Sequence, residues 1–347
     1  MRAYVLHGAD DLRFENVAMP EPKIDEVLVR VMAAGICGSD IPRIYTTGAH
    51  RHPLIPGHEF SGVVEQVGNE KNKEWQGKRV GIFPLIPCRE CPSCKKKQYE
   101  MCRQYGYLGS RQDGGFAEYV AVPAANLIVL PESVLFEEAA MLEPLAVAVH
   151  AMRRVALLSE DKVVVCGLGT IGRLLTMALQ AAGVRKLLLV GNKDSQRHFS
   201  TTIDGAVFLD MREIGARDRL LRECRDLGAD TYFECVGRNE TVTLGIECVA
   251  PGGKVVLVGN PASDMTLEKD VYWQILRKQL FLAGTWNSSF TGEDGDDWHE
   301  AIRLLEAKKI DPTRIISHRL PLEDIERGLH IMRDKTEDSC KIMAVME

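Results

Sequence analysis

One segment in the middle of the chain constrains the fold more than any other. A charged start and a short apolar run occupy 162–166, the glycine-rich turn GLGTIG follows at 167–172, an apolar helical stretch covers 173–182, and a second apolar run covers 186–190. This order describes a complete β-α-β unit, in which the two strands are parallel. Later apolar runs fit further strands of the same parallel sheet, buried on both faces, at 231–234, 254–259 and 280–285.

The sequence on either side of this sheet has a different character. Short strand patterns separated by turn residues dominate the N-terminal part, which predicts a β-rich region with strands at 3–7, 12–16, 26–33, 61–67, 77–83 and 115–122. Helical spacing appears at 135–155, 298–309 and 322–332, and a last strand is expected at 342–346. The fold class is therefore α/β, with a β-rich part and a parallel-sheet part.

Length and charge narrow the class of protein. A chain of 347 residues exceeds one ordinary hydrophobic core and predicts two domains. The formal net charge of −6 argues against nucleic acid as a partner, because phosphate backbones select basic surfaces. The first 15 residues carry charges and lack the apolar core of an export signal, and no long uncharged apolar run follows. We therefore expect a cytoplasmic protein without a membrane span, in which the clustered ones among the ten cysteines bind metal rather than form disulfides.

Four cysteines lie close together in sequence with the spacing CxxCxxCx7C: Cys88, Cys91, Cys94 and Cys102. Four thiolates at this spacing can surround a tetrahedral ion and leave no position for a substrate, which indicates a structural zinc. An iron–sulfur cluster could use similar spacing. The lysines at 95–97 favour zinc, since they suit the excess negative charge of a tetrathiolate.

The glycine-rich turn predicts a dinucleotide site. Gly167, Gly169 and Gly172 follow a strand and open a helix, which is the context that a phosphate-binding turn requires. Gly169 lets the backbone approach a pyrophosphate, and the free N–H groups at the start of the helix, around Thr170 and Ile171, favour an anion.

The second strand of that unit ends without the acidic residue that usually binds the ribose of NAD. Gly191 stands there instead, followed by Asn192, Lys193 and Arg197. A glycine leaves room and cations attract a phosphate, so the pattern favours NADP over NAD. In the alternative, Asp194 reaches the ribose and NAD is preferred.

Two short stretches, CGSD at 37–40 and GHEFSG at 57–62, predict a catalytic metal site. Cys37 and His58 offer a thiolate and an imidazole, the ligands that zinc prefers, and adjacent glycines allow the turns that bring them to an ion. Glu143 lies among apolar neighbours, where a carboxylate is costly unless it is paired or binds metal, and is the third expected ligand. Either water or Glu59 would be the fourth, because catalysis needs an exchangeable position.

Two further side chains near these ligands have expected roles. Asp40 would orient His58 through its second ring nitrogen, and Ser39 would relay a proton from a metal-bound hydroxyl. Ser39 could instead only cap a turn.

Together these motifs resemble the zinc-containing medium-chain dehydrogenases over the length of the chain. The resemblance rests on CGSD and GHEFSG, the four cysteines, DGGFAEY at 113–119, Glu143-Pro144 and the glycine-rich turn. Within that family the chain is similar to the polyol (sorbitol) dehydrogenases. Finer features resemble the galactitol-1-phosphate dehydrogenases: SDIPR at 39–43, GAH at 48–50, PLIPC at 84–88 and GSR at 109–111.

The resemblance implies a particular domain organisation. A GroES-like catalytic domain would cover 1–152, with the structural zinc lobe at about 84–104, and a Rossmann domain would cover 153–290. Residues 291–347 would return to the catalytic domain. The family also implies a homodimer or homotetramer, and a nicotinamide pocket lined by Val236 and Val258.

The implied reaction is zinc-dependent oxidation of a sugar alcohol, with hydride transfer to NAD(P). If the substrate carries a phosphate, the expected contacts are Arg43 and Arg111, with His50 and Lys341 behind them. One departure from the family is Pro42, which stands where alcohol dehydrogenases often place a proton-relay histidine. An unphosphorylated polyol or secondary alcohol is the alternative substrate. A nucleotide-binding protein without catalysis is a remote alternative, which the intact ligand set disfavours.

Overall fold

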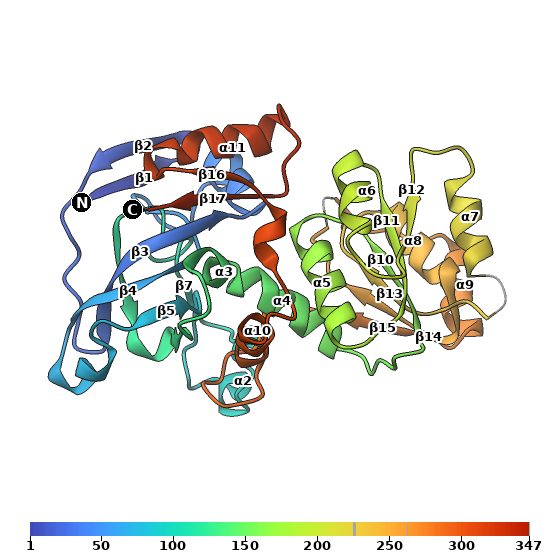
Figure 1. Ribbon diagram of the computed structural model, residues 1–347, viewed down its shortest axis with the longest axis horizontal. Coiled ribbons are helices and arrows are strands. Elements are labelled where there is room, and N and C mark those ends of the chain that lie inside the picture. The colour runs from blue at the N-terminus through green and yellow to red at the C-terminus, as the bar shows by residue number, and fades with distance from the viewer. Residues whose placement is uncertain (225–226, 262, 347) are drawn as a thin grey trace. The chain divides into compact units, whose positions relative to one another are not determined.

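The computed structural model describes residues 1–224, 227–261 and 263–346. The chain divides into two compact units, which we call the first unit (1–146 and 288–347) and the second unit (147–287). The sequence-based boundaries at 152/153 and 290/291 differ from these by a few residues. Both ends of the chain belong to the first unit (Figure 1).

The second unit is built on a six-stranded sheet in which all neighbouring strands are parallel. Its strand order is β12-β11-β10-β13-β14-β15, so that the order reverses between β10 and β13, as in doubly wound α/β folds. The strands are β10 (Lys162–Cys166), β11 (Lys186–Gly191), β12 (Val207–Asp210), β13 (Ala229–Glu234), β14 (Val249–Leu257) and β15 (Phe281–Gly284).

Helices connect these strands and surround the sheet (Figure 1). They are α5 (Thr170–Ala181), α6 (Asp194–Ser200), α7 (Ala216–Glu223), α8 (Asn239–Cys248) and α9 (Lys269–Arg277). The predicted β-α-β unit is confirmed as β10, α5 and β11. Its strands are buried because consecutive valines and leucines point to both covered faces of the sheet.

The first unit contains a seven-stranded sheet with the order β16-β17-β3-β4-β5-β9, to which β8 adds by pairing with β3. Two short pairs, β1 with β2 and β6 with β7, lie beside it. The strands are β1 (Arg2–Gly8), β2 (Asp11–Asn16), β3 (Glu26–Ile36), β4 (Glu59–Val67), β5 (Arg79–Ile82), β6 (Leu85–Ile86), β7 (Gly106–Tyr107), β8 (Tyr119–Pro123), β9 (Leu127–Val129), β16 (Ile316–Leu320) and β17 (Lys341–Val345).

Strand β3 organises this sheet, because it pairs with β17, β4 and β8. Gly35 lies opposite Met343 of β17 and opposite Glu59 of β4. The last strand of the chain therefore lies beside the strand that leads into the CGSD motif.

The helices that lie wholly or partly in the first unit are short, apart from three. They are α1 (Asp40–Pro42), α2 (Pro92–Lys95), α3 (Phe136–Ala140), α4 (Leu142–Arg153), α10 (Asp297–Glu306) and α11 (Ile325–Asp334). One of them, α4, ends in the second unit. The single helix expected at 135–155 is two helices, because Met141 ends α3 and α4 begins at the next residue. Within the described residues, no helix is both long and apolar enough to span a bilayer.

Candidate active site

The structure brings three of the expected metal ligands together. Cys37 follows β3, His58 precedes β4, and Glu59 is the first residue of β4. One potential ligand atom from each lies within 4.8 Å of the others. A thiolate, an imidazole and a carboxylate in one buried cluster form a donor set that suits zinc.

Asp40 is fully buried behind this cluster and has three polar neighbours. Its Oδ2 accepts a hydrogen bond from the Cys37 amide at 3.0 Å, and its Oδ1 accepts one from Arg43 Nη1 at 2.5 Å. His58 Nδ1 lies 3.4 Å from the same Oδ1, which is an ion-pair distance without hydrogen-bond geometry. Burial raises the pKa of Asp40, but His58, Arg43 and the Cys37 amide outweigh it, so the pKa falls below its usual value.

The same environment acts on His58. Burial lowers the pKa of its imidazole, and the negative charges of Asp40 and Cys37 then raise it well above the usual value. Ser39 Oγ donates to Cys37 Sγ at 3.3 Å. The Ser39 hydroxyl therefore lies at the edge of the cluster, where a proton could leave it.

Glu143 lies in the first turn of α4 and is 8% exposed. It is not part of the tight cluster, but the charges of His58 and Glu59 act on it. Burial raises the pKa of its carboxyl group to about 7. Tyr107 donates a hydrogen bond to Glu143 Oε1 at 3.2 Å, and its ring meets the His58 ring edge-on at 5.7 Å. Sequence reasoning missed Tyr107, because only the fold brings it to Glu143.

Lys341 does not have the position expected for a substrate-phosphate contact. It is 2% exposed at the start of β17, where its ammonium pairs with Glu59 Oε2 and donates to the Ile36 carbonyl at 3.0 Å. Burial lowers the pKa of this ammonium. The negative charges of Glu59 and Cys37 raise it by more than burial lowers it, so the pKa lies above its usual value. The expectation for Lys341 is corrected: its charge is buried and already paired.

The other three expected phosphate contacts lie near one another. The His50 backbone N–H donates a hydrogen bond to the Ser110 carbonyl at 3.4 Å. The pKa of His50 is lowered, mainly by burial and also by the positive charges of Arg111 and Arg43. The Arg111 guanidinium lies over the Tyr105 ring at 4.7 Å. The Tyr105 ring meets that of Tyr107 at 6.2 Å, so a row of rings leads from Arg111 to His58.

The four cysteines of the second cluster also converge. Their sulfur atoms all lie within 4.8 Å of one another, and Cys88 and Cys94 are 3.9 Å apart. Cys91 precedes α2, Cys94 lies inside it and Cys102 follows a short 3₁₀ turn. Hydrogen bonds from backbone N–H groups lower the pKa of Cys91 to about 6, as suits a thiolate ligand. All ten cysteines are free of disulfides.

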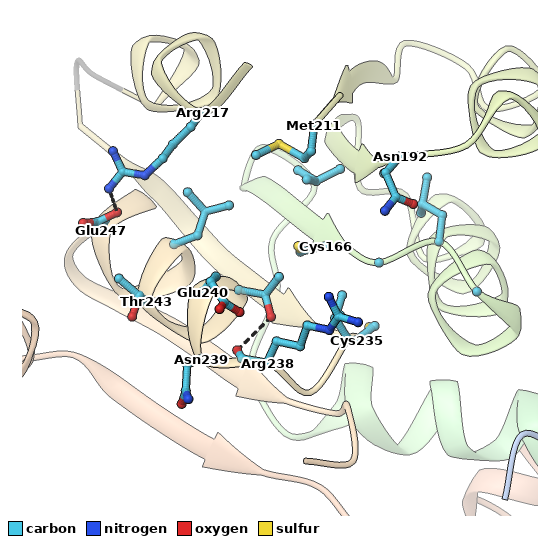
Figure 2. Close-up of a pocket in the computed structure, with 18 of the residues that line it drawn as sticks. Cys166, Asn192, Met211, Arg217, Cys235, Arg238, Asn239, Glu240, Thr243 and Glu247 are labelled. Atoms are coloured by element: carbon cyan, nitrogen blue, oxygen red, sulfur yellow. Dashed lines mark hydrogen bonds and ion pairs between the residues drawn. The ribbon is translucent and has the colours of Figure 1, made fainter. Parts of the chain in front are cut away.

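The second unit carries a cavity of about 1020 Å³ at the carboxyl ends of β10, β11 and β13 (Figure 2). Gly167, Gly169, Asn192 and Val236 line it, as the predicted nucleotide site requires. Gly167 has a φ of 94°, and a Cβ on Gly172 would lie 1.8 Å from the Gly167 carbonyl oxygen. Glycine is needed at both positions for the turn to close.

Gly191 is buried at the end of β11 for a specific reason. A Cβ there would lie 2.5 Å from the amide oxygen of Gln196. That amide accepts from the Asn192 backbone N–H at 2.7 Å and donates to the Leu168 carbonyl at 3.2 Å. A neutral amide therefore occupies the space where a carboxylate would start, and Asp194 instead pairs with Arg212 at 2.5 Å.

Arg197 is engaged elsewhere. Its guanidinium pairs with Asp210 Oδ2 at 2.9 Å and with Glu213 Oε1 at 2.7 Å. Arg217 and Arg238 line the cavity, although sequence reasoning missed both; Arg217 is paired with Glu247 (Figure 2). Of the other expected cofactor contacts, the following are absent from the described lining of the cavity: Thr170, Ile171, Gly172, Lys193, Arg197 and Val258.

The chain matches two family descriptions. Residues 23–132 match an alcohol dehydrogenase GroES-like domain, and residues 170–307 match a zinc-binding dehydrogenase. The chain belongs to the zinc-binding medium-chain dehydrogenases. The dehydrogenase is therefore an oxidoreductase with a GroES-like and a Rossmann-type domain, as the motifs predicted.

Curated relatives and a solved structure agree with this assignment. The dehydrogenase is 33% identical to galactitol 1-phosphate 5-dehydrogenase of Escherichia coli, over 94% of each chain. It is 31% identical to human sorbitol dehydrogenase, over 92% of this chain and 89% of the relative. It superimposes with a TM-score of 0.89 on a zinc-binding dehydrogenase from Sinorhizobium meliloti bound to NADP, at 27% identity over 99% and 98% of the two chains.

Proposed function

We propose that this dehydrogenase oxidises a secondary hydroxyl of a sugar alcohol phosphate, of the galactitol 1-phosphate kind, to the ketose phosphate. The row of side chains from Arg111 through Tyr105 and Tyr107 to His58 carries the proposal. The row ends in a guanidinium, a group that can bind phosphate in a bidentate manner, and this supports a phosphorylated substrate. The relationship to the E. coli galactitol 1-phosphate enzyme supports the same substrate class.

Cys37, His58 and Glu143 are the residues that would hold a catalytic zinc, whose charge lowers the pKa of a bound hydroxyl. Asp40 keeps His58 oriented from behind, and Tyr107 fixes the Glu143 carboxylate through its hydroxyl. Ser39 would accept the substrate proton at Oγ and pass its own proton outward, and a bound nicotinamide would supply the hydride acceptor. The four cysteines of the other cluster would hold a structural zinc.

NADP is the proposed cofactor. Gln196 fills the position of a ribose-binding carboxylate, and Asp194 is paired with Arg212. A solved relative at 27% identity is bound to NADP, which supports this choice. Because Arg197 pairs with two carboxylates and Lys193 does not line the described cavity, Asn192 is the remaining candidate from the sequence pattern to contact the extra phosphate of NADP.

The function is tested with a panel of polyols and polyol 1-phosphates, each assayed with NAD and NADP, before and after chelation of zinc. The expected result is a kcat/KM about 10- to 100-fold higher for a hexitol 1-phosphate than for the free hexitol, which is the contribution of hydrogen bonds to a charged group. Turnover should be faster with NADP and lost after chelation. Equal kcat/KM values for hexitol 1-phosphates and free hexitols would refute the phosphorylated substrate. A strong preference for NAD would refute NADP as the cofactor.

An unphosphorylated polyol is the second candidate substrate. The pairing of Arg43 with Asp40 and the burial of Lys341 favour it, since both remove cations from the expected phosphate contacts. The relative human sorbitol dehydrogenase is named for such a substrate, since sorbitol is a polyol without a phosphate.

Replacing Arg111 with alanine should separate the two candidates. We expect kcat/KM for the polyol phosphate to fall about tenfold or more, mainly through KM, because a bidentate phosphate contact is lost. Activity on a free polyol should not change. Arg333→Ala is the matched control, since Arg333 also lies over a tyrosine ring, that of Tyr45. An unchanged KM for the phosphate would remove Arg111 from the site.

We also infer that the dehydrogenase forms a dimer through β15. This strand is at the edge of its sheet and exposes Phe281 and Leu282. Large apolar side chains are also exposed on α9, which precedes the strand, and just after it: Tyr272, Trp273, Leu276 and Trp286. An open edge with apolar neighbours fits the same edge of a second copy around a twofold axis. Phe281→Glu should yield monomers in sedimentation velocity, whereas Ile214→Glu, at an exposed residue elsewhere in the unit, should not. A Phe281→Glu protein that sediments like the wild type would refute this interface.

A further inference from the structure

The ion pair between Lys341 and Glu59 joins distant parts of the chain at the metal-ligand cluster. Both side chains are 2% exposed, and 282 positions separate them in sequence. Lysine is rarely buried to this extent unless it is paired. The Lys341 ammonium has two partners, Glu59 Oε2 and the carbonyl oxygen of Ile36, the residue before Cys37.

The Glu59 carboxylate pairs with this ammonium and also belongs to the metal-ligand cluster. It follows His58 directly in sequence, and one of its oxygens lies within the 4.8 Å cluster. Gly35 leaves the room that the pair needs, because a Cβ there would lie 2.5 Å from Glu59 Oε2 and 3.4 Å from Lys341 Cδ. The same carboxylate therefore pairs with Lys341 through Oε2 and lies within reach of a metal held by Cys37 and His58.

We propose that Lys341 is a positioning residue that holds the Glu59 carboxylate off the catalytic zinc and so keeps one coordination position open for substrate. The proposal rests on the catalytic zinc of the proposed function. It also accounts for charge: the Cys37 thiolate and the Glu59 and Glu143 carboxylates carry one more negative charge than a zinc ion neutralises, and the ammonium supplies the missing positive charge.

A purely structural ion pair would behave differently. Its loss would lower stability but would leave the coordination of the metal unchanged. If Lys341 positions Glu59, its removal releases a carboxylate that can bind the metal and close the open position. Metal coordination is therefore the deciding readout.

The experiment uses the full-length protein loaded with Co²⁺, whose visible absorption reports the number and type of ligands. In Lys341→Met we expect a changed cobalt spectrum and a removal of this ion by phenanthroline that is about tenfold slower. Adding Glu59→Gln to that variant should restore the wild-type spectrum and rate. The four-cysteine site contributes equally to every variant and cancels in difference spectra.

Two further variants complete the design. Lys278→Met is the matched control, because Lys278 is a partly buried lysine that donates to three backbone carbonyls of the second unit. It should keep the wild-type cobalt spectrum. Lys341→Arg keeps the charge and should also keep it. Lys341→Gln removes the charge but retains a hydrogen-bond donor, so it should change the spectrum and provides the test if Lys341→Met does not fold.

Three results would overturn the proposal. The first is a Lys341→Met protein with the wild-type spectrum and removal rate. The second is a change that Glu59→Gln fails to reverse. The third is a changed spectrum in the single Glu59→Gln variant, which would show that Glu59 binds the metal in the wild type. None of these readouts uses substrate or nucleotide, so they are independent of whether the polyol phosphate is the substrate.

Discussion

Replacing Cys37 with serine should lower kcat/KM about a thousandfold and remove one of two bound zinc ions. The thiolate is the softest donor of the catalytic cluster, and serine cannot replace it at neutral pH. A metal that stabilises a developing alkoxide contributes several kcal/mol to the barrier, and each 1.36 kcal/mol is a factor of ten in rate. Zinc content by mass spectrometry and steady-state kinetics together measure the effect.

The control for this prediction is Cys224→Ala. Cys224 is a buried thiol of the second unit that belongs to neither cysteine-containing metal cluster, so its loss should leave both zinc ions in place. If Cys37→Ser keeps two zinc ions and full activity, Cys37 is not a ligand and the catalytic site lies elsewhere.

Replacing Cys94 with alanine should remove the other zinc ion and lower the midpoint of thermal unfolding by about 10 °C or more. The segment around it has little secondary structure of its own, since α2 covers four residues and the following 3₁₀ turn covers three. The metal therefore replaces the hydrophobic core that such a segment lacks.

This second prediction concerns stability and not chemistry. Zinc content and differential scanning calorimetry measure it, with Cys224→Ala again as the control. Three cysteines would remain at the site, so the loss of metal should be complete only at low free zinc. A Cys94→Ala protein that unfolds at the wild-type temperature without the ion would show that the cluster is not structural.

Local patterns in the sequence predicted most of the strands and helices. Consecutive valines predicted β10 because a strand buried on both faces needs no alternation. The four-residue strand β12 was missed, since its apolar run of Val207, Phe208 and Leu209 is short and its first residue is exposed. Met141 divides the expected long helix, although the apolar spacing continues through it into α4.

The site was predictable where its residues lie next to glycines or close together in sequence. Cys37, His58 and the four cysteines satisfy that condition. The environment of Lys341 and the contact of Tyr107 with Glu143 depend on strands and loops that are far apart in sequence, so charge and residue type alone misplaced or missed them. The same holds for Arg197, whose acidic partners are Asp210, the last residue of β12, and Glu213 just after it.

The discontinuity of the first unit also has a consequence during protein synthesis. Strand β17, at 341–345, is made after the entire second unit, although it pairs with β3 at 26–36. Until then, the β3 edge that β17 covers has no partner among the strands already made, and Glu59 has no ammonium beside it. A nascent chain can complete its parallel sheet before β17 is made, whereas the metal-ligand cluster reaches its final charge balance only once β17 has left the ribosome.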